Sequence, residues 1–467
     1  MKMCRWKWQR TCGVSGSMVA VLVKAAAAFW CVAAPGALAK SHDVPWTLEA
    51  ATQRVLEASP AMFAAQAGID EAAAKLSQAQ FVYIPQATVT ASLTTIQGQR
   101  GTAFNGYINE DEHGAFFKLG VRGGFPIYAF GQLEALRAAA ENGVDVAEFT
   151  RDIVAAELQF LLREAWFGLL LANDLGAILD EGMSYLSKAK KRLLAMEESD
   201  DPTYDQVELL RLRVYEADVH AQRLVVAKGK TQALSGLTAL LNLPAGTPIQ
   251  VEPLQLTPIE VTLQNSEFYL NLAESRRPEL RLANSAVAAA AAIANLRLWQ
   301  FFPGIAVVGE YNFASSPVAD DQRGSFNADP YHKNGGGAAL AMQWKVALFK
   351  QWADRQEALA VLRGGMEKRD EFLRTSRGDV LVAVSEVERQ QQRLASNTSS
   401  LKAARSWLVA KSDLYDTGFA AFDEVADALL QFYARKLAHV QTIHDLNMAI
   451  SRLSRVVGTD IVALPPN

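Results

Sequence analysis

The sequence has 467 residues, half of them apolar, so it is long enough to form a substantial core. It carries 46 Lys and Arg residues against 50 Asp and Glu residues, and this balance disfavours a nucleic-acid partner, which requires a basic surface. Beyond the amino terminus, no stretch offers 18 uninterrupted apolar residues, which excludes transmembrane helices.

Residues 1–39 have the pattern of a secretory signal peptide. A basic start precedes an apolar run, Ala25–Ala34, and a small-x-small cleavage sequence, Ala37–Ala39. A membrane anchor is the alternative, but the uncharged run after Lys24 is too short to span about 30 Å of hydrocarbon. We therefore expect a mature chain that begins at Lys40.

The leader also contains all three cysteines, Cys4, Cys12 and Cys31, so the mature chain is predicted to have neither disulfides nor thiol chemistry. Cys31 follows Trp30 instead of a small residue, which argues against lipidation. Five basic and no acidic residues are removed with the leader, leaving 41 basic residues against 50 acidic ones and a net charge of −9.

The rest of the chain contains one unit twice, at an offset of 218 residues. Pro60 and Pro85 in the first copy correspond to Pro278 and Pro303 in the second, and each pair brackets a helix-like segment that leads into an alternating one. The sequence therefore predicts a first repeat over 40–243, a proline-rich connector over 244–264, a second repeat over 265–458 and a tail over 459–467.

Four segments alternate between apolar and polar residues, which is the period of a β-strand with one apolar face. They are predicted over about 85–96, 115–127, 303–314 and 337–347, as one hairpin in each repeat. The hairpin loops, about 96–114 and 315–336, are long enough to be extracellular. Strands of this length fit a tilted membrane-spanning barrel, although a soluble half-buried sheet would show the same alternation.

Polar residues of these strands are expected to line the lumen of such a barrel, the alternative being anchoring at the membrane interface. They are Thr88, Thr90, Lys118, Arg122, Glu310 and Lys345. Four strands cannot close a barrel, and an open edge in lipid would leave backbone groups unpaired at several kcal/mol apiece. Several chains must therefore share one barrel if the strands span a membrane, and three chains give twelve strands.

Two proline-free stretches predict helices longer than those of any globular domain. They run over about 131–196 and 351–411, and each would extend about 90 to 100 Å at 1.5 Å per residue. A polar turn and a second helix, over about 204–241 and 422–457, follow them. Each pair should form a long antiparallel hairpin.

Motifs along the whole mature chain resemble those of the TolC-like outer-membrane efflux proteins, or outer membrane factors. They are Thr47-Leu48-x-x-Ala51 with Ser59-Pro60, Arg277-Pro278-Glu279-Leu280, Phe125-Pro126-Ile127, Phe130-Gly131-Gln132 and the segment from Tyr415-x-x-Gly418 to Gly458. The resemblance implies a mainly α fold with a membrane β-barrel part. It implies a homotrimer, with a twelve-stranded barrel in the outer membrane of a Gram-negative bacterium and a twelve-helix α-barrel in the periplasm. It further implies docking onto a periplasmic adaptor and an inner-membrane pump of the RND or ABC type.

In that family, acidic rings and inter-helix links close the periplasmic taper. By position, Glu424 and Asp427 match the ring carboxylates, Tyr415 matches a linking tyrosine, and Asp205 matches its acidic counterpart in the first hairpin. The arginine usually found between them is Ala420 here, a departure that bears on the ion-pair lock but not on the constriction.

The spacing of the two ring residues supports this interpretation independently. Glu424 and Asp427 are three residues apart on a helix and share a face, so in a three-fold assembly each would form a ring of carboxylates that favours cations. A solvated acidic helix face is the alternative. The tip of the first hairpin, Glu197–Asp201, is acidic and lacks the turn usual in the family, so the family's adaptor contact cannot be carried over to it; the alternatives are a solvated turn and an adaptor site.

The sequence contains no phosphate-binding loop, dinucleotide fingerprint, HExxH or GxSxG motif, and its six histidines are scattered. We therefore expect no enzyme activity, no metal site and no cofactor. The predicted function is a passive exit duct for small molecules expelled by a tripartite efflux system. Two alternatives stay open: the outer-membrane component of a type I protein-secretion system and, in another class, a periplasmic coiled-coil adaptor or scaffold.

Overall fold

The computed structural model describes residues 45–102, 104–199, 204–244, 246–324 and 328–463. The predicted signal peptide, the end of the acidic turn at 200–201 and the last four residues of the tail lie outside these ranges.

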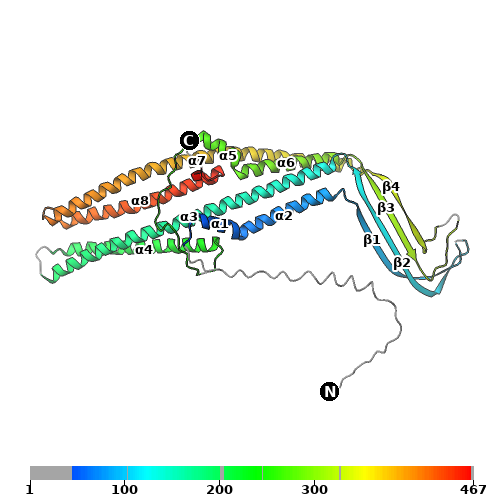
Figure 1. Cartoon of the computed structure of the whole chain (residues 1–467), viewed down its shortest axis with the longest axis horizontal. Coiled ribbons are helices and arrows are strands. Elements are labelled where there is room, and N and C mark those ends of the chain that lie inside the picture. The colour runs from blue at the N-terminus through cyan, green and yellow to red at the C-terminus, as the bar shows by residue number, and fades with distance from the viewer. Residues whose placement is uncertain (1–44, 103, 200–203, 245, 325–327, 464–467) are drawn as a thin grey trace, which may run out of the picture. The chain divides into compact units, whose positions relative to one another are not determined.

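One order of elements occurs twice in the described residues (Figure 1). The first set is α1 (Leu48–Ala58), α2 (Pro60–Phe81), β1 (Gln86–Arg100), β2 (Tyr107–Tyr128), α3 (Gln132–Glu198) and α4 (Gln206–Leu240). The second set is α5 (Ser266–Arg276), α6 (Pro278–Trp299), β3 (Gly304–Ser315), β4 (Lys333–Gln343), α7 (Leu348–Asp416) and α8 (Phe422–Val457), followed by the short helix η1 (Ile461–Ala463). The fold is mainly helical with four strands, as predicted.

The helices that enter the strands start in the same way in both sets. α2 and α6 each have 22 residues and begin with a proline, at Pro60 and Pro278. Proline is favourable at the first helical position, because the N–H that it lacks would have no partner inside the helix. Ser59 caps α2, since its Oγ accepts a hydrogen bond from the N–H of Ala61 at 3.3 Å.

The four strands form one antiparallel sheet in the order β1-β2-β3-β4. β1 and β2 extend further than the predicted loop over about 96–114 allows, since β1 ends at Arg100 and β2 begins at Tyr107. The hairpin continues past a register shift between Gln97 and Gly98 and is held there by an ion pair between Arg100 and Glu112. Alternation could not show this extension, because a cross-strand ladder outside a buried region does not need an apolar face.

The predicted range of β4 is wrong by four residues at each end. The strand begins at Lys333, because the glycines assigned to the loop pair with β3; a Cβ atom on Gly336 would overlap the carbonyl oxygen of Glu310. The strand ends at Gln343. Beyond it, the indole N–H of Trp344 donates to the carbonyl of Phe301 at 3.0 Å, which directs the chain into α7.

The long helices pack side by side in rows. Next to the sheet, the neighbours run α2, α3, α6, α7; toward the hairpin tips they run α4, α3, α8, α7. The end of α3, the start of α4 and the turn between α7 and α8 lie at the end opposite the strands (Figure 1). α7 continues through Lys411 to Asp416, so the second turn is shorter than predicted.

Two apolar clusters lie in the middle of the helical region, and the proline-rich connector contributes to both. Leu162, Trp166 and Leu237 belong to the first, together with Val251 of the connector. Val384, Val387 and Ile450 belong to the second. The connector is fixed to the helices by polar groups as well, since Asn447 Oδ1 accepts from the N–H of Ile259 at 2.9 Å.

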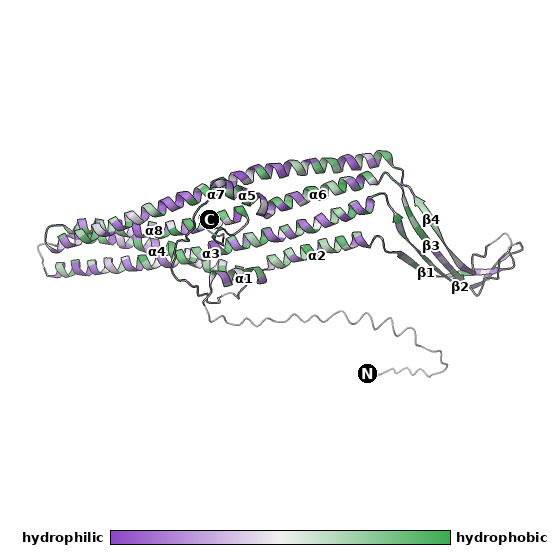
Figure 2. Cartoon of the chain, turned by 45° about the horizontal axis from the view of Figure 1, so that its top comes forward, coloured by the Kyte–Doolittle hydropathy of each residue, from purple (hydrophilic) through white to green (hydrophobic). Residues whose placement is uncertain are grey.

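Apolar and polar residues both occur along each helix (Figure 2). Among the described residues, no helix contains an apolar stretch sufficient to carry it across a lipid bilayer.

Candidate functional site: the polar sheet face and the acidic hairpin end

The strand register gathers the predicted lumen residues on one face of the sheet. Thr88 pairs with Arg122, and Arg122 pairs with Glu310. Residues directly opposite each other in antiparallel strands project from the same face. Arg122 and Glu310 form an ion pair at 3.3 Å, which is too exposed to contribute much stability. Thr90 and Lys118 share this face, because each is an even number of residues from Thr88 or Arg122.

Lys345 does not belong to that face. It lies two residues beyond the end of β4, in the segment that leads to α7, so its prediction as a strand residue is wrong. The side-chain amide of Gln351 donates to the carbonyls of Lys345 and Gln300, at 2.9 and 2.7 Å. These hydrogen bonds hold the backbone of the segment outside the ladder.

The opposite face of the sheet is apolar and exposed. In the single chain, 63% of Val89, 71% of Leu93 and 70% of Leu340 is accessible. Large apolar groups of this kind are normally covered, so this face requires a neighbour or a nonpolar solvent.

At the far end of the helices, Asp205 begins α4. Its carboxylate accepts a hydrogen bond from the N–H of Val207 at 2.7 Å, the geometry of a helix N-cap. A negative charge at this position is also stabilised by the helix dipole. Asp205 therefore has a structural role in addition to the linking role predicted for it.

Glu208 lies one turn further along α4, where charges of both helical hairpins act on its carboxylate. Burial raises the pKa of Glu208, and the charges of Asp423, Asp205 and Asp427 raise it further, although Arg211 acts in the opposite direction. Arg211 pairs with Glu208 at 3.1 Å. Residues of α4 and of α8 thus contribute to one acidic group, in which like charges oppose one another.

Glu424 is held differently from Asp427, although both were predicted to belong to one ring. The Lys411 ammonium forms an ion pair with Glu424, and this hydrogen bond and charge hold the pKa of Glu424 below its usual value. Asp427 is exposed and acts on Glu208 instead. Among the described residues, the structure therefore places one of the two predicted ring carboxylates, Glu424, in an ion pair and the other, Asp427, in none.

Tyr415 contacts residues of both hairpins. Its ring packs edge-on against Phe422, with centroids 6.1 Å apart, and the guanidinium of Arg192 from α3 lies 5.5 Å from the ring centroid. A cavity of about 310 Å³ between α3, α4, α7 and α8 adjoins this contact. A cation over an aromatic face is attractive, so Arg192 connects the first hairpin to the second.

Three participants were missed by sequence reasoning: Glu208, Lys411 and Arg192. For Glu208 a signal existed, since its spacing of three from Asp205 places both on one helix face. The pairing of Lys411 and the position of Arg192 depend on how the hairpins pack, which no local pattern shows. Within the described part of the chain, no group of three or more His, Cys, Asp or Glu side chains is arranged to hold a metal ion.

Comparison with solved structures identifies the fold. The outer-membrane channel OprN superposes with a TM-score of 0.73 at 17% identity, over 89% of this chain and 90% of that one. The outer membrane protein VceC of Vibrio cholerae gives 0.72 at 16% identity, over 89% of this chain and 96% of that one. The outer membrane channel CmeC of Campylobacter jejuni gives 0.71 at 14% identity, over 88% and 85%. No family model matches the chain, and no curated protein matches it by sequence.

The fold defines the class: this chain has the architecture of outer-membrane channels of the TolC-like type. The mainly helical fold with a four-stranded antiparallel sheet, which the sequence resemblance implies for the single chain, is thereby confirmed.

Proposed function

We propose that three copies of this chain form a passive exit duct through the outer membrane of a Gram-negative bacterium. The duct would carry small molecules outward from an inner-membrane RND or ABC pump and a periplasmic adaptor. One observation carries the proposal. The sheet and both rows of helices are open at their two ends, and these ends are suited to contact with another copy.

The end strands of the sheet are connected in sequence to the end helices of the adjoining row. In the sheet, β1 and β4 are the edge strands. α2, which leads into β1, and α7, which follows β4, are the end helices of the adjoining row. Joining the first end of one copy to the last end of the next is a heterologous contact, which generates a closed ring when the rotation fits. Three copies give twelve strands and leave no open edge.

The end helices carry unpaired apolar stripes near the hairpin tips. On α4 the exposed residues recur at alternating intervals of three and four, the spacing of a coiled-coil seam. They are Val207, Leu210, Val214, Ala217, Ala221 and Leu224. A corresponding exposed stripe on α7 consists of Ala403, Trp407, Ala410 and Leu414. Because α4 and α7 lie at opposite ends of the row, the α4 stripe of one copy can cover the α7 stripe of the next.

Closure of the ring gives the two sheet faces their roles. The apolar face, with Val89 and Leu93, would contact lipid, and the polar face, with Thr88, Thr90, Lys118, Arg122 and Glu310, would line the lumen. At the inner end, the carboxylates of Asp205, Glu208, Asp423 and Asp427 would recur in each copy. Such a ring of negative charge favours cations and resists anions.

The mass of the purified full-length protein tests the assembly. We expect extraction from outer membranes only with detergent, a trimer by native mass spectrometry and ion conductance in planar bilayers. A protein that leaves cells with the soluble periplasmic fraction, as a monomer, would refute the duct and favour a scaffold.

The roles of the two sheet faces are tested with single cysteines at adjacent positions. We expect a water-soluble maleimide to label a Thr90→Cys variant and to leave a Val89→Cys variant unlabelled in outer membranes, since the two side chains project from opposite faces. Both side chains are exposed in the isolated chain, so unfolding in denaturant should make both reactive, which provides the control. Labelling at position 89 alone would reverse the assignment.

A further inference from the structure

The segment that follows β3, residues 316–321, crosses the sheet instead of turning directly into β4. We refer to it as the strap. The N–H of Gln99 in β1 donates to the carbonyl of Val318 at 2.9 Å, and the N–H of Asp320 donates to the carbonyl of Gln99 at 2.7 Å. Since β2 lies between β1 and β3, the strap must pass over β2 to make these bonds.

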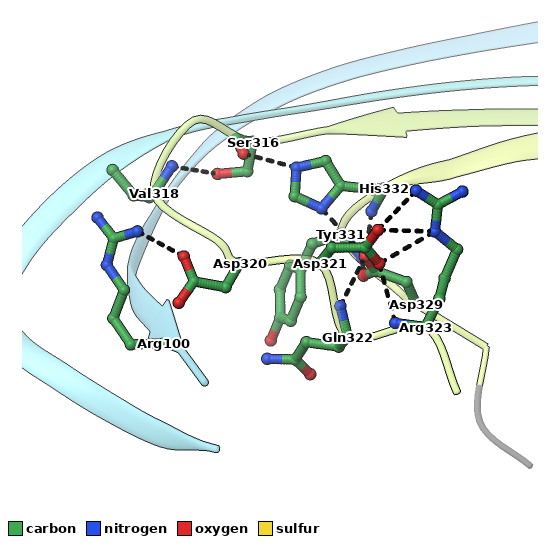
Figure 3. Close-up of polar contacts among 10 residues, drawn as sticks. All are labelled: Arg100, Ser316, Val318, Asp320, Asp321, Gln322, Arg323, Asp329, Tyr331 and His332. Carbon is green, nitrogen blue, oxygen red and sulfur yellow. Dashed lines mark hydrogen bonds and ion pairs between the residues drawn. The ribbon is translucent and has the colours of Figure 1, made fainter. Parts of the chain in front are cut away.

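Side chains of the strap and of β1 strengthen this connection (Figure 3). Arg100 Nη1 lies 2.8 Å from Asp320 Oδ1, and the N–H of Gly101 donates to Asp320 Oδ2 at 2.9 Å. Arg100 also pairs with Glu112 of β2. One guanidinium thus joins the strap to both strands of the first hairpin.

The strap lies on the polar face of the sheet. Gly114 shares its face with Lys118 and Arg122, because the strand alternates between them. A Cβ atom on Gly114 would overlap the side chain of Val318, so the strap covers β2 on that side. Phe116, on the same face, packs edge-on against Tyr331 with ring centroids 5.8 Å apart. The same face is the one assigned to the lumen.

Hydrogen bonds from other residues of the same loop also hold the strap in place. Asp329 is buried and accepts hydrogen bonds from the backbone N–H groups of Gln322, Tyr331 and His332, at 3.1, 2.8 and 3.1 Å. His332 Nε2 lies 3.0 Å from the carbonyl oxygen of Ser316, which is itself only 1% exposed (Figure 3). The strap is therefore a folded, hydrogen-bonded element.

We propose that this strap narrows the outer mouth of the duct and sets an upper size for solutes that pass between the lumen and the outside. This inference rests on the proposed function, since it requires the polar face to enclose a water-filled lumen. In a three-fold assembly, three straps fold inward at one level. The carboxylate of Asp320 holds each strap against β1, in addition to the backbone hydrogen bonds with Gln99.

Labelling of a lumen cysteine from outside tests the strap. A Thr88→Cys variant carries its thiol at the opposite end of β1 from Gln99, so an external reagent must pass the strap to reach it. The probe is a polyethylene-glycol maleimide too large for porins, applied to intact cells, and labelling at position 88 is read by mass spectrometry. Adding Asp320→Ala should accelerate labelling roughly three- to tenfold, the range expected for loss of a charged, partly exposed contact.

Asp321→Ala is the matched control. Asp321 belongs to the same strap but pairs with Arg323 at 2.6 Å and, among the described residues, forms no hydrogen bond or ion pair with β1, so its removal should leave the labelling rate unchanged. A tether provides the reverse test. Cysteines introduced at Gln99 and Ala319, which are bridge partners, should form a disulfide that restores slow labelling in the Asp320→Ala background, and a reductant should abolish the effect. Thr90 and Gly120 are ladder partners away from the strap. A disulfide between cysteines at these two positions should not restore slow labelling.

Two results would overturn the inference, and they can be distinguished. If a small maleimide labels position 88 but the large one reacts equally fast in all variants, the duct stands and the strap does not restrict it. If even the small maleimide fails to label position 88 in isolated outer membranes, the polar face is not a lumen, and the proposed function fails together with the strap.

Discussion

The outer and inner ends of this chain are organised by opposite kinds of electrostatic contact. At the outer end, Arg100 joins Glu112 and Asp320 by attraction, and all the partners belong to one chain. At the inner end, Asp423, Asp205 and Asp427 act on Glu208 by repulsion, against the attraction of Arg211. An attractive contact inside one chain is complete before assembly, whereas like charges around an axis multiply with each added copy. The outer restriction should therefore belong to the protomer and the inner one to the assembly.

The largest effect on this difference between the two ends is expected when assembly is prevented. Val214, 59% exposed in the isolated chain, lies in the middle of the α4 stripe, so Val214→Asp should not disturb the protomer but would bury a charge between copies. Burial of an unpaired charge costs several kcal/mol, and we expect loss of nearly all trimer in native mass spectrometry. The disulfide between Gln99→Cys and Ala319→Cys should still form, because the strap contact lies within one chain.

Gln222→Asp serves as the control for that substitution. Position 222 is exposed on α4 but is not part of the stripe, so the same charge should leave the trimer intact. Trimers that persist in the Val214→Asp variant would show that α4 does not form the contact between copies.

Neutralising the inner end should have a smaller effect. With Glu424→Ala and Asp427→Ala combined, we expect the cation-to-anion permeability ratio in planar bilayers to fall about threefold and block by divalent cations to weaken, because the ring loses Asp427 from each copy. The loss at position 424 also frees Lys411, which adds a positive charge at the same level.

Removal of two acidic side chains elsewhere provides the comparison for selectivity. Glu49 and Glu57 are exposed on α1, away from the hairpin tips, and replacing both with Ala changes the net charge equally. Unchanged selectivity in the Glu424→Ala, Asp427→Ala variant, or an equal change in the α1 variant, would rule out a selective ring at the hairpin tips.

Periodic patterns predicted the parts of the molecule that repeat. Alternation in the strands was sufficient to assign Thr88, Arg122 and Glu310 to one face, because successive side chains of a strand project from opposite faces. The absence of proline was sufficient to predict the length of α3 and α7. These features depend on neighbours in sequence, or on one cross-strand partner.

The strap and the charge pairs could not be predicted in this way. Arg100 and Asp320 are 220 residues apart, and the loop around Asp320 has no period that would indicate where it folds. The same limit explains Glu424, whose partner Lys411 lies on the other helix of its hairpin. A pattern indicates which face a residue occupies, but the charge that meets it depends on packing.

The smallest expected effect concerns Glu208 and the way in which its ionisation changes the stability of α4 with pH. Its pKa in the folded protein is raised above the ordinary value of 4.5, so the charged form is disfavoured by folding. The charged Glu208 therefore lowers the stability of the folded protein at neutral pH, and this loss is absent below pH 4.5, where the carboxyl is protonated in both the folded and the unfolded chain. Glu208→Gln should therefore slow amide hydrogen exchange in the first turns of α4 roughly twofold at pH 7, with no difference in acid.

Glu216→Gln should act in the opposite direction, because Glu216 pairs with Lys190 at 2.7 Å and its loss removes an attraction. The two substitutions remove one carboxylate each from the same helix, so they separate repulsion from attraction at equal change in charge. Faster exchange in the Glu208→Gln variant at pH 7 would mean that the pair with Arg211 outweighs both the cost of burying the carboxylate and the repulsion from Asp205, Asp423 and Asp427. The inner end would then be held by attraction in the single chain, as the outer end is.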